Sequence, residues 1–265
     1  MSALGVYRRG FSLALSRELV YRVNFFLGRV REFIVYGSLL FLFQSIPQGL
    51  GRYTSDQAMS YLLVSSLLSA PLFVYGMHTM AGEIADGDFT NYLLRPLNYF
   101  GYWTSRLLAS RALLFFGGMI ELLILILLFA RGNFFVQNSG IAWIQALLLL
   151  IGSLTLVQLI DFIGALLSFW TNRGHGPRWM MTVLIQLLSG AYLPLDLIPS
   201  SFKRLLFLSP FPTIIYGPVK AYLGKLSSHE FMILLLTQWI WILLFGASVF
   251  ILWKRGVRIY GAYGR

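Results

Sequence analysis

Two long runs of the sequence contain no charged residue, and they constrain the fold more than any other feature. Residues 59–80 and 231–253 are each uncharged, and about 20 mostly apolar residues are enough for a helix to cross a bilayer. The whole chain of 265 residues is 57% hydrophobic and 12% charged, whereas soluble domains carry about a quarter charged residues. We therefore expect a protein whose solvent is largely lipid.

Four further apolar segments complete a predicted set of six spans. Residues 141–170 contain only Asp161 as a charged residue, and residues 113–130 contain Glu121 and begin one or two turns earlier, near Arg106. Residues 33–50 and 179–195 are shorter and close to the lower length limit for a span. The sequence predicts an all-α, polytopic membrane protein with six transmembrane helices, in which residues 1–265 form a single domain.

The distribution of basic residues predicts the orientation. With an even number of spans, both termini lie on the same side of the membrane. If that side is the cytosol, 15 of the 21 Lys and Arg residues fall in inner segments and six in outer ones, as the positive-inside rule requires. No cleavable signal peptide is predicted, because arginines from Arg8 to Arg22 interrupt any early apolar core.

The first 30 residues carry a pattern of their own. Tyr7, Phe11, Leu15 and Leu19 recur at every fourth position, which predicts a helix lying along the cytosolic interface over residues 1–30, with arginines reaching the lipid head groups. The plainer alternative is a basic cytosolic tail.

Between the second and third spans the chain reads GEIADGDFTNYLLRPL, residues 82–97. Either Asp86 or Asp88 can cap a helix N-terminus, where a carboxylate accepts from free N–H groups. Pro96 disfavours a helical conformation at Arg95, so a short helix over residues 89–94 is predicted.

On that short helix, Phe89, Tyr92 and Leu93 have the spacing of one small apolar face. We interpret this face as a knob that fits a groove on another protein, and not as part of the core. Glu83 could pair with a basic group on that partner or with an arginine of a neighbouring inner segment. The alternative is an ordinary hydrated loop whose acids keep it out of the lipid.

The segment 189–229, after the fifth span, is too apolar for a solvated loop and is interrupted by prolines. Proline removes a backbone donor and stops helices, which predicts short helices that dip into the membrane and return. Such broken backbone is tolerated at membrane depth only where protein or a water-filled cavity covers it. We expect this region to cap the outer mouth of the bundle. Its marked residues are Gly190, Pro194, Pro199, Pro210, Pro212 and Pro218.

Motifs for catalysis are missing from the sequence. There is no cysteine, and the one Gly-Lys pair, Gly224-Lys225, lacks the rest of a phosphate-binding loop. The three histidines lie in separate segments, so no metal site is predicted. Glu121 and Asp161 lie inside spans, where an unpaired acid is costly. They either line a transport path or a proton site, or they form interhelical contacts or reach the wetted interface.

Several of these stretches together resemble the permease subunits of ABC-2 type exporters, and more narrowly the compact six-span branch found in bacteria. The stretches are GEIADGDFTNYLLRPL, the Phe169-Trp170 end of the fourth span, SGAYLPLDLIP, SPFPTIIYGPVKAYLG and the basic tail WKRGVRIYGAYGR. The tail ends Gly-Ala-Tyr-Gly-Arg, where the family leads us to expect a pair of glycines.

The resemblance implies the following architecture. Two six-span permeases, homologous or identical, form a central path, and two ATPase subunits that carry ATP and Mg²⁺ dock on the cytosolic side. The loop after the second span, here 81–106, would be the coupling loop, and 189–229 would be the extracytoplasmic re-entrant region. The implied ATPase-coupling residues are Glu83, Asp86, Asp88, Phe89, Tyr92, Leu93, Arg95 and Pro96.

The function implied by this resemblance is that of a membrane permease, without enzymatic activity or a cofactor of its own, in an ATP-driven exporter of the bacterial inner membrane. Its substrate would be hydrophobic or amphipathic, such as a lipid, glycolipid, peptide or drug. The alternative is an ion-coupled secondary transporter or channel that uses Glu121 and Asp161.

Overall fold

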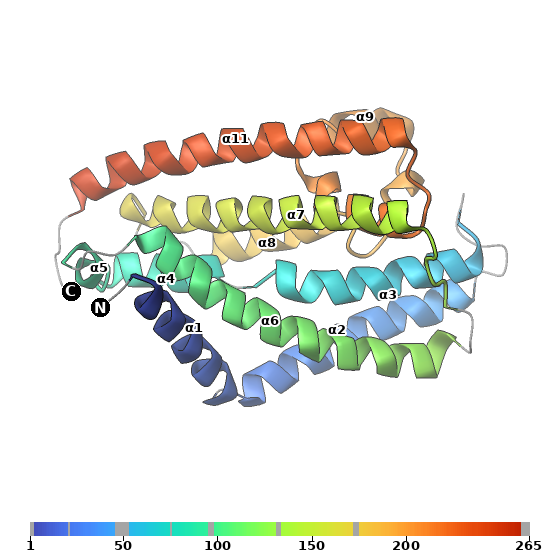
Figure 1. Cartoon of the computed structure of the whole chain (residues 1–265), viewed down its shortest axis with the longest axis horizontal. Coiled ribbons are helices and arrows are strands. Elements are labelled where there is room, and N and C mark those ends of the chain that lie inside the picture. The colour runs from blue at the N-terminus through green and yellow to red at the C-terminus, as the bar shows by residue number, and fades with distance from the viewer. Residues whose placement is uncertain are drawn as a thin grey trace.

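The computed structural model describes residues 3–20, 22–45, 53–74, 76–94, 98–130, 134–171 and 175–260. The regular elements in these ranges are helices that run along one long axis (Figure 1). The N-terminal part consists of α1 (Ala3–Val20), α2 (Arg22–Gln44), α3 (Ser55–Leu72) and α4 (Gly76–Ala85). The predicted all-helical fold class is therefore confirmed.

The middle and C-terminal parts contain the other long helices. After the four-residue helix α5 (Thr90–Leu93) come α6 (Tyr99–Leu125), which a single π-helical turn extends to Ala130, and α7 (Gly140–Leu166), which a 3₁₀ turn extends to Phe169. The chain then forms α8 (His175–Leu188) and ends with α11 (Ser228–Ile259). Between α8 and α11 lie the short helices α9 (Ser200–Leu206) and α10 (Tyr216–Tyr222) and two one-turn 3₁₀ helices.

Four stretches of the described chain are long and apolar enough to cross a membrane: Ser55–Ala85, Tyr99–Phe129, Gly140–Phe169 and Ser228–Ile259. They correspond to the second, third, fourth and sixth predicted spans. The helices at the first and fifth positions do not reach this standard. The N-terminal half of α2 carries Arg29, Arg31 and Glu32, and the apolar part of α8 is only Trp179–Leu188.

The second predicted span is not one continuous helix. Pro71 lies inside the last turn of α3, and the chain leaves the helical path after Leu72 and resumes it at Gly76. Proline removes the N–H that would bond the carbonyl four residues earlier, and the span is divided into two helices just after it. The connection that follows this span covers only residues 86–98, because α4 continues to Ala85 and α6 begins at Tyr99.

Helix α1 packs along the first half of α6. Gly10 lies close to the ring of Tyr102, and Gly101 lies close to Tyr7, so a small residue on each helix admits an aromatic ring from the other. Ser110 on α6 donates a hydrogen bond of 2.9 Å to Glu18. A helix is present in the predicted N-terminal segment, but α1 ends at Val20 and α2 begins at Arg22, within the predicted range 1–30. These contacts hold α1 against the bundle.

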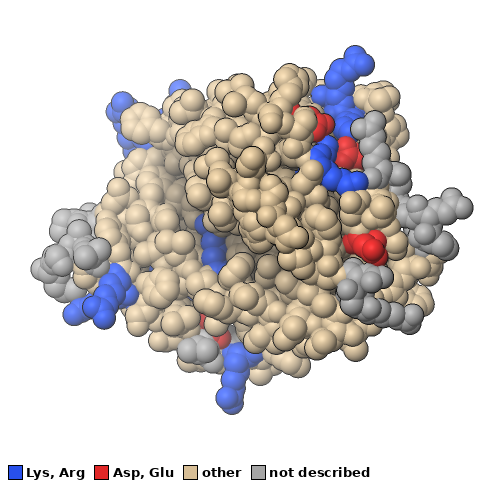
Figure 2. Space-filling model, turned by 45° about the vertical axis from the view of Figure 1, so that its right-hand side comes forward, with Lys and Arg blue, Asp and Glu red and all other residues tan. Residues whose placement is uncertain are grey.

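The buried side chains form two clusters. One joins α2, α3, α7, α10 and part of α11 around Tyr36, Tyr61, Leu149 and Tyr216. The other joins α4, α6, α7 and the end of α11 around Phe89, Trp103 and Phe162. Helix α5 and both chain ends lie at one end of the molecule, and α9 lies at the other (Figure 1). Charged side chains are sparse on the face in Figure 2.

Candidate functional site

The predicted coupling segment surrounds a buried aromatic ring. Phe89 has no exposed surface, and its ring contacts Tyr99, Phe169, Trp253 and Tyr260 at centroid distances of 5.1, 5.4, 5.6 and 5.0 Å. These partners belong to the start of α6, the end of α7 and the end of α11. The prediction that Phe89 is an exposed knob is therefore wrong, because aromatic side chains from distant parts of the sequence enclose it.

The capping prediction is also wrong. The residue that precedes α5 is Phe89, and neither Asp86 nor Asp88 caps the helix, since no side chain makes a cap hydrogen bond there. Gly87 takes a positive φ of 89°, a turn conformation that suits glycine, and the N–H of Phe89 then donates to the carbonyl of Glu83 at 2.9 Å. After this turn, the ring of Phe89 lies against the start of α6 and the ends of α7 and α11.

The outward side of the segment carries a different set of residues. Asp86, Asp88 and Asn91 are exposed, and Leu94 is 78% exposed, whereas Tyr92 is half-buried. Leu93 lies within α5, and Arg95 and Pro96 lie outside the described residues. Among the described side chains of this segment, a docking partner meets acids, an amide and one exposed large apolar side chain, Leu94.

Glu83, at the end of α4, pairs within the chain. Its carboxylate lies 2.9 Å from the guanidinium of Arg106 on α6, and that guanidinium also lies 4.0 Å from the centre of the Trp103 ring. A guanidinium over an indole ring gains a cation–π attraction. The sequence left two possible partners for Glu83, a basic group on another protein or an arginine of a neighbouring inner segment. In the structure the partner is an arginine, Arg106 on α6.

Each acid inside a span also faces an arginine. Glu121 on α6 lies 3.3 Å from Arg29 on α2, and Asp161 on α7 lies 3.9 Å from Arg111 on α6. Arg111 donates as well to Gln158 at 2.9 Å. Opposite charges placed together in an apolar medium lower the cost that each would have alone. The interpretation of Glu121 and Asp161 as interhelical contacts therefore has an arginine partner for each acid.

The outer segment begins with a tight turn fixed to α3. Gly190 has a φ of 80°, and an added Cβ would lie 2.9 Å from the hydroxyl of Tyr61. Tyr61 donates to the carbonyl of Gly190 at 2.6 Å, and Ser65 donates to the carbonyl of Ala191 at 2.5 Å. A glycine is needed here both for its backbone conformation and for the close approach.

Prolines divide the rest of this segment into short helices, as predicted. Pro194, Pro199 and Pro210 each stand immediately before a short helix. Pro212 lies inside the helix that Pro210 precedes, and Pro218 lies inside α10. From residue 212 to residue 223 every side chain is buried. Other parts of the chain therefore cover this broken backbone, which is the condition for such backbone at membrane depth.

A carboxylate at the centre of this region joins its parts. Asp196 accepts hydrogen bonds from Tyr53 at 2.6 Å, Lys203 at 2.9 Å and Tyr216 at 2.9 Å, and Lys220 lies at 3.6 Å. Burial alone would raise the pKa of Asp196, but these donors and the nearby ammonium charge lower it to about 2. The carboxylate is therefore ionised at physiological pH.

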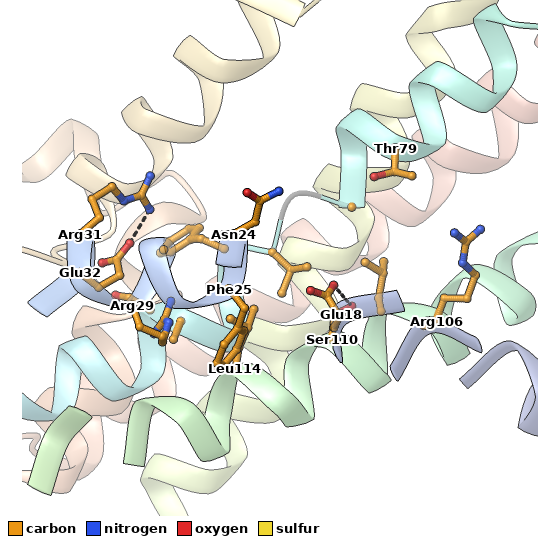
Figure 3. A pocket seen from close by; sticks show the side chains of 18 of the residues that line it. Glu18, Asn24, Phe25, Arg29, Arg31, Glu32, Thr79, Arg106, Ser110 and Leu114 are labelled. Atoms are coloured by element: carbon orange, nitrogen blue, oxygen red, sulfur yellow. Dashed lines mark hydrogen bonds and ion pairs between the residues drawn. The ribbon is translucent and has the colours of Figure 1, made fainter. Parts of the chain in front are cut away.

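A cavity of about 640 Å³ opens between α1, α2, α6, α8 and the break after α3. Its lining includes polar and charged side chains from α1, α2 and α6, shown in Figure 3, together with apolar ones. Ligand pockets in proteins commonly have volumes of roughly 300–1,000 Å³. The charged lining residues are Arg17, Glu18, Arg29, Arg31, Glu32 and Arg106.

Sequence reasoning missed Asp196, Arg29 and this cavity. An acid inside an apolar, proline-bounded stretch is a signal that could have indicated Asp196. Arg29 gave no such signal, because its partner Glu121 lies 92 residues away. Among the described residues, no group of three or more His, Cys, Asp or Glu side chains could hold a metal ion.

The long apolar helices and the charge-poor surface define a helical membrane protein. The family model described as ABC-2 family transporter protein matches residues 32–264, so the chain belongs to that family. It is accordingly a permease subunit of an ABC transporter, a membrane component that transports and is not itself catalytic, in a family that associates with ATPase subunits. None of the curated proteins matches the chain.

Proposed function

We propose that this permease moves a hydrophobic or amphipathic substrate out of the cytosol, driven by ATP hydrolysis on partner subunits that hold the ATP and Mg²⁺. The substrate would be a lipid, glycolipid, peptide or drug. In this proposal six spans cross the bacterial inner membrane, with α2 and α8 as the first and fifth, and both termini are cytosolic. A second permease, homologous or identical, completes the path, and an unlike subunit is the pairing we favour.

The ATPase would dock on the outward side of the segment between α4 and α6. Asp86, Asp88 and Asn91 offer hydrogen-bond acceptors and a charge, and Leu94 offers an apolar contact that is 78% exposed. Exposed apolar side chains rimmed by polar ones are typical of protein contact sites. These four residues replace Phe89 and Tyr92 as the proposed contact face.

The buried side of the same segment would transmit the push. Phe89 contacts rings at the ends of α6, α7 and α11 within 5.0–5.6 Å, and close-packed interiors shift in discrete steps instead of deforming smoothly. A displacement of α5 therefore moves the ends of three long helices together. We call Phe89 and the four rings around it the aromatic joint: Tyr99, Phe169, Trp253 and Tyr260. The aromatic joint is the observation that supports the proposal beyond the family match.

The path from the joint to the outer region would run through α4 and α3. Helix α4 ends beside the joint, and α3 holds the carbonyls of Gly190 and Ala191 through Tyr61 and Ser65. The break at residues 73–74 separates α3 from α4. It would act as a hinge about which α4 moves relative to α3. We propose that bending at this hinge opens and closes the region 189–229 as an outer gate in an alternating-access cycle.

The ion-coupled alternative gains no specific support. It requires Glu121 or Asp161 to exchange a cation or a proton, yet each faces an arginine, at 3.3 and 3.9 Å. A guanidinium at that distance already supplies the positive charge that a transported ion would bring. The two acids are more simply explained as partners that let arginines enter the bundle.

The docking proposal is tested by the substitution Leu94→Asp. We expect the variant to insert and accumulate normally but to lose co-purification of a soluble P-loop ATPase by about tenfold, because the contact loses its apolar side chain and gains a charge. The matched control is Val136→Asp, which changes another exposed apolar residue, 62% exposed, in the connection before α7. Equal ATPase recovery with both variants would contradict docking at this segment.

A further inference from the structure

The cavity beside α2 presents both signs of charge to one space. In the view of Figure 3, Glu18 lies between Arg106 on one side and Arg29 and Arg31 on the other. Glu18 is held by Ser110 through a hydrogen bond of 2.9 Å, so its carboxylate is oriented by the protein. The carboxylate of Glu18 also lines the cavity, so it can contact a ligand there.

The charges of the cavity and of its immediate neighbours balance. Arg29 pairs with Glu121, and Arg106 pairs with Glu83. The two arginines line the cavity, whereas the two glutamates are not among its lining residues. Within the lining, Arg31 pairs with Glu32, and Arg17 and Glu18 supply one further charge of each sign. A ligand with a net charge would therefore leave one charge uncompensated in a partly apolar space, where an unpaired charge is costly.

Space for an apolar group exists next to these charges. A Cβ atom added at Gly28 on α2 would meet no atom within 4 Å, and Gly28 lines the cavity. Phe25, Leu107 and Leu114 form apolar parts of the same lining. The outer face of α2 continues this apolar character, with Phe26 65% and Leu27 57% exposed. An alkyl chain could therefore enter along α2 while a polar group stays inside.

We propose that this cavity binds an amphiphile with a zwitterionic head group. Its anionic group, a phosphate or a carboxylate, would be held by arginines of the lining, and its ammonium would be held by Glu18. The inference rests on the proposed function, because it names the substrate class of the exporter, but the binding step itself needs neither ATP nor the ATPase.

The binding test uses the full chain purified in a non-ionic detergent and three probes with the same alkyl tail. Dodecylphosphocholine is zwitterionic, dodecyl phosphate is anionic and dodecyltrimethylammonium is cationic. Native mass spectrometry counts the probe molecules bound to each chain. We expect dodecylphosphocholine to bind about tenfold more tightly than either of the others, since only it pairs with both kinds of charge. Tighter binding of either the anionic or the cationic probe would overturn the proposal.

Two variants assign this binding to the cavity. Glu18→Gln keeps the acceptor for Ser110 and removes the charge, and we expect it to lower the affinity for dodecylphosphocholine about tenfold while strengthening the binding of dodecyl phosphate. Gly28→Leu fills the space and should abolish the site. Its control is Gly246→Leu, also at a helical glycine with open space around it, which lies on α11 away from the cavity lining. Equal losses in the two glycine variants, or none, would refute the assignment.

A separate measurement distinguishes this inference from the proposed function. The same probes are added to the complex of the permease with its ATPase in vesicles, and ATP turnover is recorded. Binding to the purified chain without stimulated turnover would leave the site assigned and remove its role in ATP-driven export. Stimulated turnover that Gly28→Leu does not reduce would place the transported substrate elsewhere.

Discussion

Asp196 joins side chains from three parts of the chain. Tyr53 precedes α3, Lys203 lies on α9, and Tyr216 and Lys220 lie on α10. Lys220 also approaches Glu230, at 3.4 Å, at the start of α11. A carboxylate with several donors can fix the relative positions of short helices that have little packing of their own. Asp196 therefore organises the region that we propose as the outer gate.

This arrangement predicts how stability depends on pH. The pKa of Asp196 is about 2 in the folded protein, below the ordinary 3.8, so its stabilising contribution is present above pH 3.8 and is lost as the pH falls toward 2. We expect Asp196→Asn to lower the free energy of unfolding by about 2 kcal/mol at pH 7. The difference from the unsubstituted chain should shrink on acidification.

Thermal unfolding of the detergent-solubilised chain, followed by tryptophan fluorescence at pH 7 and pH 3, measures this difference. The matched control is Asp56→Asn, since Asp56 is exposed at the start of α3. A gap between Asp196→Asn and the unsubstituted chain that stays constant across this pH range would show that the Asp196 charge is not what stabilises the region.

At the scale of elements, the break between α3 and α4 is the feature with the clearest mechanical meaning. Almost all of α3 is buried, and its outer half is hydrogen-bonded to the turn at Gly190. Helix α4 can therefore move relative to α3 only through the break. The N–H of Gly76 bonds the carbonyl of Val74 at 2.8 Å, which makes this connection compact.

Removing the proline should stiffen this connection. Pro71→Ala restores an N–H that can bond the carbonyl of Leu67, and we expect it to stabilise the chain by up to about 3 kcal/mol while slowing substrate-stimulated ATP turnover severalfold. Gly246→Ala is the control, because it raises helix propensity in α11 by about 1 kcal/mol without touching the break. Unchanged turnover in Pro71→Ala would exclude the break as a hinge.

Periodicity and apolar content predicted some helices better than others for physical reasons. Helices α7 and α11 follow from long runs with one charge or none. The start of α6 was placed too late because Arg106 and Arg111 look incompatible with a buried helix until their partners on α4 and α7 are known. The apolar run at α8 was extended to Leu195, but the chain turns at Gly190, where φ is positive.

The candidate site was less predictable because its key contacts are distant in sequence. The spacing of Phe89 and Tyr92 indicates that they share a face, but not what covers that face. The covering rings of Trp253 and Tyr260 follow more than 160 residues later. The cavity likewise forms from five separate segments, and none of them has a motif that indicates a binding site.

At the scale of the whole molecule, the two ends differ in what they expose. The end with α5 presents acids and Leu94, and the other end includes the connection 134–139 and the short helices around Asp196. In the proposed orientation the first end faces the cytosol. The sequence has no cysteine, so a single introduced thiol reports the location of one residue.

Labelling of two single-cysteine variants tests this orientation. In intact cells, a membrane-impermeant maleimide should modify Val136→Cys and leave Asp86→Cys unmodified, because only the former is expected to be outside. After the cells are opened, both thiols should react, since both side chains are exposed. Modification of Asp86→Cys in intact cells would reverse the orientation and place the proposed ATPase contact on the wrong side.

The ion pair between Arg29 and Glu121 also constrains how this sequence can vary in evolution. Loss of either residue alone leaves a lone charge among apolar helices, a cost of several kcal/mol, while replacement of both by uncharged residues removes that cost. Mutations at these two positions are therefore expected to be inherited together. In diverging lineages, a substitution of Arg29 in α2 should be accompanied by a substitution of Glu121 in α6.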